Sequence, residues 1–140
     1  LYIDEVQSLF GHPAIISYFS KFWAEGRKFN LIATGITQNS TYMLAHEDAR
    51  NMVLNSDFVL LHKQSALDRK SWVDLLSLSA TEAGYIDDTV KAGEGLLVAG
   101  GVRVPIRDDF PKGALYDLFN TKATEIAELK RKARREGAGL

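Results

Sequence analysis

Short apolar runs alternate with amphipathic helical segments over the first half of the chain, and this alternation constrains the fold most strongly. The apolar runs cover residues 1–3, 31–36 and 58–61, and their nearly continuous character is typical of strands buried on both faces of a sheet. Apolar residues recur at helical spacing in the segments 15–24 and 45–54 between them. Pro13 marks the start of the first of these helices, and Ser79 followed three residues later by Glu82 is a capping-box signature of a later short helix. Strands that alternate with helices form parallel βαβ units with right-handed crossovers. We therefore predict an α/β fold with a mostly parallel sheet.

The pattern changes after residue 94. Residues 95–99 and 102–106 are predicted to form two strands joined by Gly100-Gly101, a pair typical of a two-residue hairpin. Pro105 indicates that the second strand lies at a sheet edge, because proline cannot donate a hydrogen bond to a neighbour. The sequence thus adds a C-terminal β-hairpin to the α/β fold.

Charged residues dominate the end of the chain. Residues 122–136 hold six Lys or Arg and three Glu, in a segment with the composition of a helix. We therefore divide the chain into an α/β domain, residues 1–120, and a charged helical tail, residues 121–140. The tail is interpreted either as a solvated helix or as a surface that contacts a nucleic acid such as DNA, an acidic membrane or a partner protein.

Composition narrows the class of protein. The chain has 140 residues, of which 46% are hydrophobic and 25% charged, as in an ordinary globular domain. It has no cysteine, which excludes disulfides and Cys-ligated metal sites. No apolar run is long enough for a membrane span. The chain begins inside a predicted strand and without Met, so we expect it to be a piece of a longer protein.

Polar residues follow each of the three predicted strands. They are Asp4-Glu5, Gln38 and Gln64. The ends of neighbouring parallel strands lie about 5 Å apart and border the crevice where open α/β sheets bind ligands. There, one carboxylate can hold Mg²⁺, a second can activate water, and a glutamine amide can orient that water. A helix-capping turn and locally bonded loop amides are the alternative interpretation.

Gly26-Arg27-Lys28 lies between the first helical segment and the second strand. A guanidinium group suits phosphate binding because its charge and geometry are fixed. The alternative is a solvated cation at a helix end, where the helix dipole favours positive charge.

These residues, in this order, resemble the second half of a P-loop NTPase domain of the FtsK–HerA superfamily. The similarity is to the conjugal transfer and type IV secretion ATPases, the large VirB-operon ATPases. It covers residues 1 to about 110 and includes, besides the segments quoted above, residues 33–38, 55–64 and 93–98. The resemblance implies a RecA-like three-layer fold, of which this chain holds the C-terminal portion.

The resemblance also implies roles for individual residues. Asp4 would be the Walker B residue that holds Mg²⁺, and Glu5 the catalytic base. Arg27 would be an arginine finger that reaches the ATP of a neighbouring subunit, and Gln38 a sensor of the γ-phosphate. Further family-pattern residues, near the subunit interface and expected to help bind the nucleotide, are Gln64, Asp68 and Arg69.

One part of the family pattern is absent. No G-x-x-x-x-G-K-[ST] loop occurs in the 140 residues, so the phosphate-binding half of the site is missing and this chain alone is expected to be inactive. In the intact parent, the resemblance implies a head-to-tail hexameric ring at the cytoplasmic face of the membrane, together with other secretion-channel components.

The leading hypothesis is ATP hydrolysis that powers conjugative DNA transfer or type IV secretion, through substrate transfer or assembly of the channel or pilus. A DNA-translocating coupling protein or a HerA-like translocase is the alternative within the superfamily. A non-catalytic docking or oligomerisation module is the alternative from another class.

Overall fold

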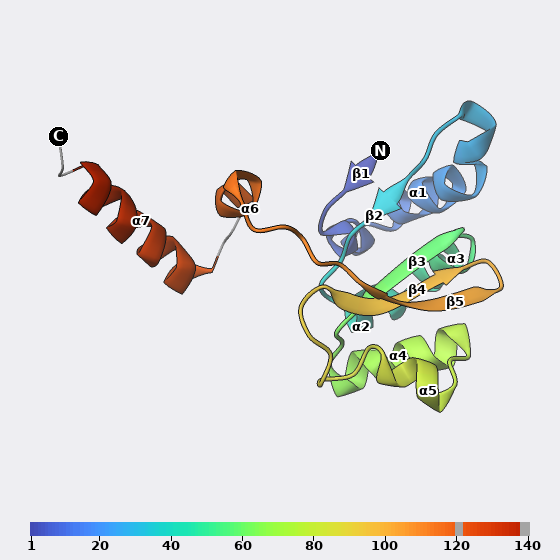
Figure 1. Ribbon diagram of the computed structural model, residues 1–140. Helices are drawn as coiled ribbons and strands as arrows, with labels where there is room; N and C mark the ends of the chain where they lie inside the picture. The colour runs from blue at the N-terminus through green and yellow to red at the C-terminus, as the bar shows by residue number, and fades with distance from the viewer. Residues whose placement is uncertain (120–121, 138–140) are drawn as a thin grey trace. The chain divides into compact units, whose positions relative to one another are not determined.

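The computed structural model describes residues 1–119 and 122–137, and the chain divides into two compact units, Leu1–Arg107 and Asp108–Leu140. The first unit is mixed α/β and carries the strands, and the described part of the second is helical (Figure 1). The domain boundary predicted at residues 120–121 lies outside the described residues.

A single parallel βαβ unit opens the chain. Strand β1 pairs in parallel with β2, and Tyr2 and Ile3 lie opposite Thr34 and Gly35. Pro13 occupies the first turn of the connecting helix, as the sequence indicates. The elements of this unit, in chain order, are β1 (Tyr2–Ile3), the 3₁₀ helix η1 (Val6–Gly11), α1 (Pro13–Glu25), the 3₁₀ helix η2 (Gly26–Phe29) and β2 (Thr34–Gly35).

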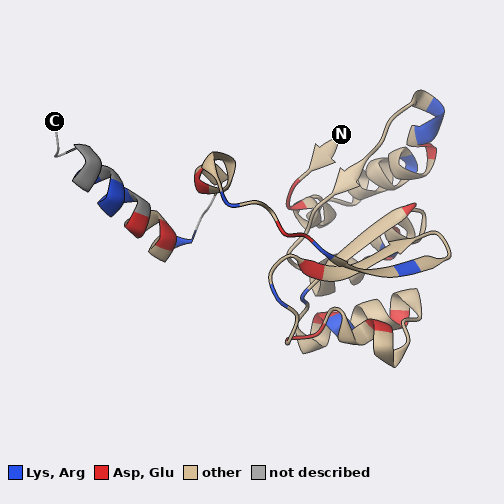
Figure 2. Ribbon diagram, viewed as in Figure 1, with Lys and Arg blue, Asp and Glu red and all other residues tan. Residues whose placement is uncertain are grey.

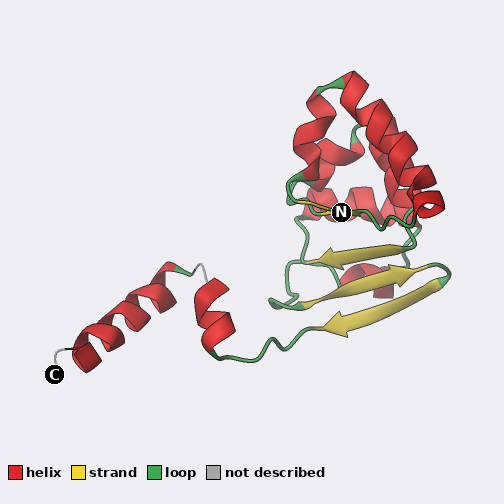
Figure 3. Cartoon of the chain, turned by 90° about the horizontal axis from the view of Figure 1, so that it is seen from above, coloured by secondary structure: helices red, strands yellow, loops and turns green. Residues whose placement is uncertain are grey.

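A separate antiparallel sheet contains the other strands (Figure 3). Its order is β3 (Phe58–His62), β4 (Glu94–Ala99) and β5 (Val102–Arg107). The predicted hairpin is confirmed, because Ala99 pairs with Val102 across the glycine turn and Gly100 has a φ of 58°, which glycine adopts without strain. Pro105 lies on β5, at the sheet edge, as expected.

The predicted mostly parallel sheet is not what the structure shows. Among the described residues, β2 pairs only with β1, and β3 pairs antiparallel with β4. Burial on both faces is also wrong for these strands, since Ile32 is 81% exposed and Phe58 is 72% exposed. An apolar run favours a strand but does not specify its neighbours. Ile32 lies before β2 begins, and Phe58 lies on a face of the antiparallel sheet where Leu60 is also exposed.

Four helices lie between β2 and β4 in the sequence, two of them before β3 and two between β3 and β4. The single helix expected at residues 45–54 is present as α3, and an additional short helix, α2, precedes it. The side chain of Asn39 caps α2 by accepting a hydrogen bond from the Tyr42 backbone N–H at 3.1 Å. The helices are α2 (Ser40–Leu44), α3 (Glu47–Leu54), α4 (Ala66–Leu76) and α5 (Ala80–Gly84).

One hydrophobic core holds the first unit together. Trp72 of α4, Met52 of α3 and Leu61 and Leu96 of the antiparallel sheet are all buried in it. The other face of that sheet is apolar and exposed. Its exposed residues are Phe58, Leu60, Val102 and Val104. The antiparallel sheet is therefore covered on one face only.

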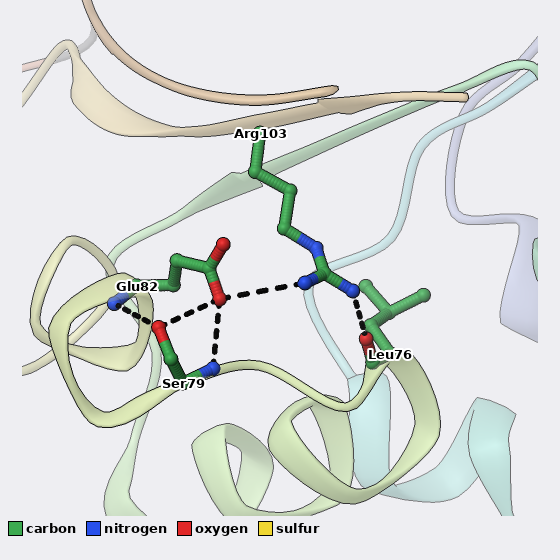
Figure 4. Close-up of polar contacts among 4 residues, drawn as sticks. All are labelled: Leu76, Ser79, Glu82 and Arg103. Atoms are coloured by element: carbon green, nitrogen blue, oxygen red, sulfur yellow. Dashed lines mark hydrogen bonds and ion pairs between the residues drawn. The ribbon is translucent and has the colours of Figure 1, made fainter. Parts of the chain in front are cut away.

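Hydrogen bonds and an ion pair join β5 to the segment from the end of α4 to α5 (Figure 4). Ser79 and Glu82 form the capping box that the sequence predicts. Arg103 of β5 donates to the backbone carbonyl of Leu76 at 2.6 Å and lies 3.5 Å from Glu82 Oε2. Hydrogen bonds from the Ser79 backbone and hydroxyl hold the pKa of Glu82 below its ordinary value, and the positive charge of Arg103 lowers it further.

The second unit contains α6 (Ala114–Phe119) and α7 (Ala123–Gly137). Tyr116 donates to Glu125 at 3.0 Å, and Lys122 contacts the same carboxylate at 3.2 Å. Acidic and basic residues are both present on α7 (Figure 2). Over the described residues, no helix has the length and apolar character needed to cross a bilayer.

Candidate functional site

Glu5 has a strained backbone at the point where β1 ends. Its φ of 52° and ψ of 44° place it in the left-handed region, which costs a non-glycine residue about 1–3 kcal/mol. The surrounding backbone holds this turn, because Val6 N–H donates to Ile36 at 3.0 Å and Ser8 N–H donates to Glu5 at 2.9 Å. A strained residue held in this way at a strand end is a reason to look for function there.

Two glutamine amides hold the Glu5 carboxylate. Gln38 Nε2 donates to Glu5 Oε1 at 2.9 Å, and Gln7 Nε2 donates to Glu5 Oε2. The structure thus brings together Glu5 and Gln38, which are separated by 33 residues in the sequence. Each carboxylate oxygen keeps a second lone pair that can accept from a water molecule.

Gln7 was missed by the sequence reasoning. Its only signal is its position two residues after Glu5, at the start of η1. Among the described residues, its buried Oε1 accepts no hydrogen bond. Gln7 therefore belongs to the site as a residue that fixes the direction of the Glu5 carboxylate.

Asp4 is exposed beside Glu5, and its Oδ1 accepts from the Glu5 backbone N–H at 2.9 Å. Mg²⁺ in nucleotide sites is held by one or two carboxylates, water and substrate phosphates. A single exposed carboxylate fits that donor set. It does not fit a metal site built from protein side chains alone, and the described residues contain no group of three or more His, Cys, Asp or Glu that could hold a metal ion.

Gln64 uses its amide within the fold. Its Oε1 accepts from Ser40 Oγ at 3.1 Å and from Trp72 Nε1 at 3.2 Å. Its Nε2 donates to the backbone carbonyls of His62 at 3.0 Å and Lys63 at 3.3 Å. The structure therefore connects Gln64 to α2 and α4, and records no bond from it to Glu5 or Gln38 among the described residues.

Asp68 also bonds to α2. Its Oδ1 accepts from the Thr41 backbone N–H at 2.8 Å and the Thr41 hydroxyl at 2.6 Å, and its Oδ2 accepts from Ser65 Oγ at 2.6 Å. Burial raises the pKa of Asp68, but the hydrogen bonds from Ser65 and Thr41 outweigh it, so the pKa lies below its ordinary value. Arg69 lies 4.0 Å from Asp87 and is partly exposed.

Arg27 is exposed on η2, at the far end of α1 from Glu5. The 13-residue helix between them is about 20 Å long. Figure 2 shows the basic segment at that end and the acidic pair at the other. Arg27 is therefore not part of the Glu5–Gln38 pair of its own chain.

The fold and the site together define an α/β protein with a carboxylate–glutamine pair at the carboxyl ends of two parallel strands. Among solved structures, the chain is similar to VirB4 of Thermoanaerobacter pseudethanolicus, with a TM-score of 0.71 and 29% sequence identity. The match covers 84% of this chain and 32% of that chain, so this chain spans about a third of that VirB4. No protein-family model and no curated protein matches the chain. This similarity to VirB4 supports the sequence resemblance to the large VirB-operon ATPases.

Proposed function

We propose that this chain is the C-terminal portion of a RecA-like ATPase domain in a conjugal transfer or type IV secretion ATPase. ATP hydrolysis by the intact parent powers substrate transfer or assembly of the channel or pilus. The observation that carries the proposal is the 2.9 Å bond between Gln38 Nε2 and Glu5 Oε1, in a chain similar to VirB4 over 84% of its length.

The chemistry follows from the positions of the polar groups. Glu5 accepts the proton of the attacking water, and its two amide partners hold the carboxylate in one orientation. Gln38 links this base to the γ-phosphate, because its Nε2 carries a second N–H that can donate to a phosphate oxygen. Asp4 would hold the Mg²⁺ that neutralises charge on the phosphates.

The phosphate-binding half of the site belongs to the rest of the parent protein. β2 and β3 each leave one edge unpaired among the described strands, and apolar residues next to both edges are exposed. A strand from the missing half that pairs with β2 and β3 would join the two sheets and cover Ile32 and Phe58. This is the arrangement that an incomplete RecA-like fold requires, and it explains why β2 and β3 are separated here.

The test is ATP turnover by the intact parent. Glu5→Gln should lower kcat by about a hundredfold or more, because the amide cannot act as a general base although it has nearly the same shape as the carboxylate. Gln38→Ala should also lower kcat, and the control Glu47→Gln, an exposed glutamate on α3, should leave it unchanged. Unaltered turnover in Glu5→Gln would refute the proposal, as would Glu5-dependent turnover by the 140-residue chain alone.

Arg27 acts on the site of a neighbouring subunit in this proposal. A head-to-tail ring, proposed as a hexamer, places η2 of one subunit against the nucleotide of the next. Random mixing of Arg27→Ala and Glu5→Gln subunits then leaves about a quarter of the interfaces with both residues intact. Turnover should therefore reappear when the two inactive variants are mixed, and a mixture that stays inactive would exclude action between subunits.

The proposed location is the cytoplasmic face of the cell membrane, where the ring contacts other secretion-channel components. The basic residues of α7 are proposed to contact DNA or the membrane surface. DNA-stimulated hydrolysis by the parent would instead favour a DNA-translocating coupling protein.

A further inference from the structure

The first turn of α2 is hydrogen-bonded to Gln64, in the segment that joins β3 to α4, and to Asp68 in the first turn of α4. Ser40 donates to Gln64 Oε1, and Thr41 donates to Asp68 Oδ1 through both its backbone N–H and its hydroxyl. Ser40 is 4% exposed, so the first of these bonds is shielded from water. The turn fastened in this way starts two residues after Gln38.

Asp68 and Gln64 have their polar atoms engaged in this attachment. Asp68 lies in the first turn of α4, where its Oδ2 accepts from Ser65, the residue that caps α4, while its Oδ1 caps α2. One carboxylate thus ties the beginnings of two helices together. The Gln64 amide makes two bonds through Oε1 and two through Nε2, so a nucleotide could bond to it only by displacing bonds that the fold already makes. Asp68 Oδ1 accepts two bonds from Thr41, so a new contact there would likewise replace a bond between the helices.

We propose that Asp68 and Gln64 are positioning residues that hold α2 in place and thereby keep the Gln38 amide on the Glu5 carboxylate. This inference rests on the proposed function and deepens it. It replaces direct nucleotide contact, which the family pattern suggests for these two residues, with action through Gln38.

The physical reason is that only a short stretch of chain separates Gln38 from the turn of α2 that bonds to Gln64 and Asp68. Asn39 lies between Gln38 and Ser40, and its side chain caps α2 by accepting from Tyr42. The backbone from Gln38 to Thr41 therefore moves with α2. A shift of the helix by about 1 Å takes Gln38 Nε2 away from Glu5, and displacements of that size cost about a hundredfold in rate at reacting centres.

The test compares steady-state ATP turnover by variants of the intact parent. Asp68→Ala should lower kcat by about tenfold or more, while KM for ATP stays within about twofold. Asp68→Asn should restore part of the loss, because its amide oxygen can still accept from Thr41. Thr41→Val, which removes only the hydroxyl donor, should lower kcat less than Asp68→Ala. The matched control is Asp74→Ala, at an exposed aspartate of the same helix.

A double-mutant cycle separates action through Gln38 from direct contact. In a Gln38→Ala parent, Asp68→Ala should cause no further loss of kcat, because the group it positions is gone. Multiplicative losses together with a raised KM would overturn the inference in favour of nucleotide contact. Unchanged kcat in Asp68→Ala would also overturn it, while the effects of Glu5→Gln and Gln38→Ala would still support the proposed function. If those two variants have no effect either, the proposed function itself fails.

A second measurement needs no ATP. In the 140-residue chain, Asp68→Asn and Thr41→Val should shift the NMR resonances of the Gln38 side-chain amide and speed amide exchange at residues 40–42. Resonances of β4 and β5 should stay in place in both variants. An unshifted Gln38 side-chain amide in folded variants would refute the coupling, whatever the turnover assay shows.

Discussion

Gly95 gives the sharpest test of the packing between β3 and β4. A Cβ at this position would lie 2.3 Å from the Leu61 carbonyl oxygen and 3.2 Å from the Leu61 carbonyl carbon. Both are backbone atoms, so no side chain can rotate away. The two strands would have to separate by roughly 1 Å to reach ordinary contact distances, next to the His62–Gly95 pair that ends their register.

The expected cost of Gly95→Ala follows from this overlap. Forced overpacking in a well-packed region costs about 1–3 kcal/mol, and a backbone clash belongs at the upper end. A loss of about 3 kcal/mol corresponds to a Tm lower by roughly 10 °C for a chain of this size. Urea and thermal unfolding of the 140-residue chain, followed by circular dichroism, would measure it.

Gly101→Ala is the matched control. No atom lies within 4 Å of a Cβ at this position, and Gly101 does not have a positive φ. The change should therefore alter the free energy of unfolding by less than about 1 kcal/mol. If Gly95→Ala is as stable as Gly101→Ala, the close approach of β3 and β4 described above is wrong.

Two further predictions concern stability. Ser79→Ala removes the cap of α5 and should cost about 1 kcal/mol in urea unfolding, whereas Ser71→Ala, on the outer part of α4, should cost less; equal costs would contradict the capping role. Asp68 has a folded-state pKa below its unfolded value, so its stabilisation is complete above about pH 4 and is lost as the pH falls through the folded-state pKa. The stability difference between the wild type and Asp68→Asn should accordingly shrink from pH 6 to pH 3, and a difference that grows on acidification would show that the sign is wrong.

The features that the sequence predicted well are those set by local chemistry. Pro13 marks the start of α1, and the Ser79–Glu82 spacing marks a capping box. Gly100-Gly101 joins the two strands of a hairpin. In each case the residue type meets a backbone requirement within four residues, so no knowledge of the tertiary structure is needed.

The features that could not be predicted depend on distant neighbours. The run at residues 31–36 has strand character, but only Thr34 and Gly35 pair in this chain. Which strand lies beside it depends on segments far away in the sequence, and so does the burial of Ile32. The helix α2 was not predicted, because it has only five residues and its one local signal is the capping residue Asn39.

In the candidate site too, one part could be predicted from the sequence and another part could not. Glu5 and Gln38 were predicted to converge because each follows a strand of one βαβ unit, and in that unit the rule about strand ends holds. Gln64 follows β3, which lies in the other sheet, so the same rule could not place it. Its partners are a buried serine and a tryptophan that no spacing in the sequence connects to it.

The backbone of Glu5 links the fold to the proposed chemistry. A glycine would occupy a φ of 52° without strain, and yet the residue there is a glutamate whose carboxylate receives two amide donors. The strain of about 1–3 kcal/mol is offset by the backbone bonds of the turn and by packing of Val6 and Phe10 in the core. A side chain held by both its backbone and its hydrogen bonds needs little rearrangement when it acts on a water molecule, and such preorganisation is where enzymes gain much of their rate. The strained turn therefore favours a catalytic role for Glu5 over a capping turn, for which an unstrained Asp or Asn would be sufficient.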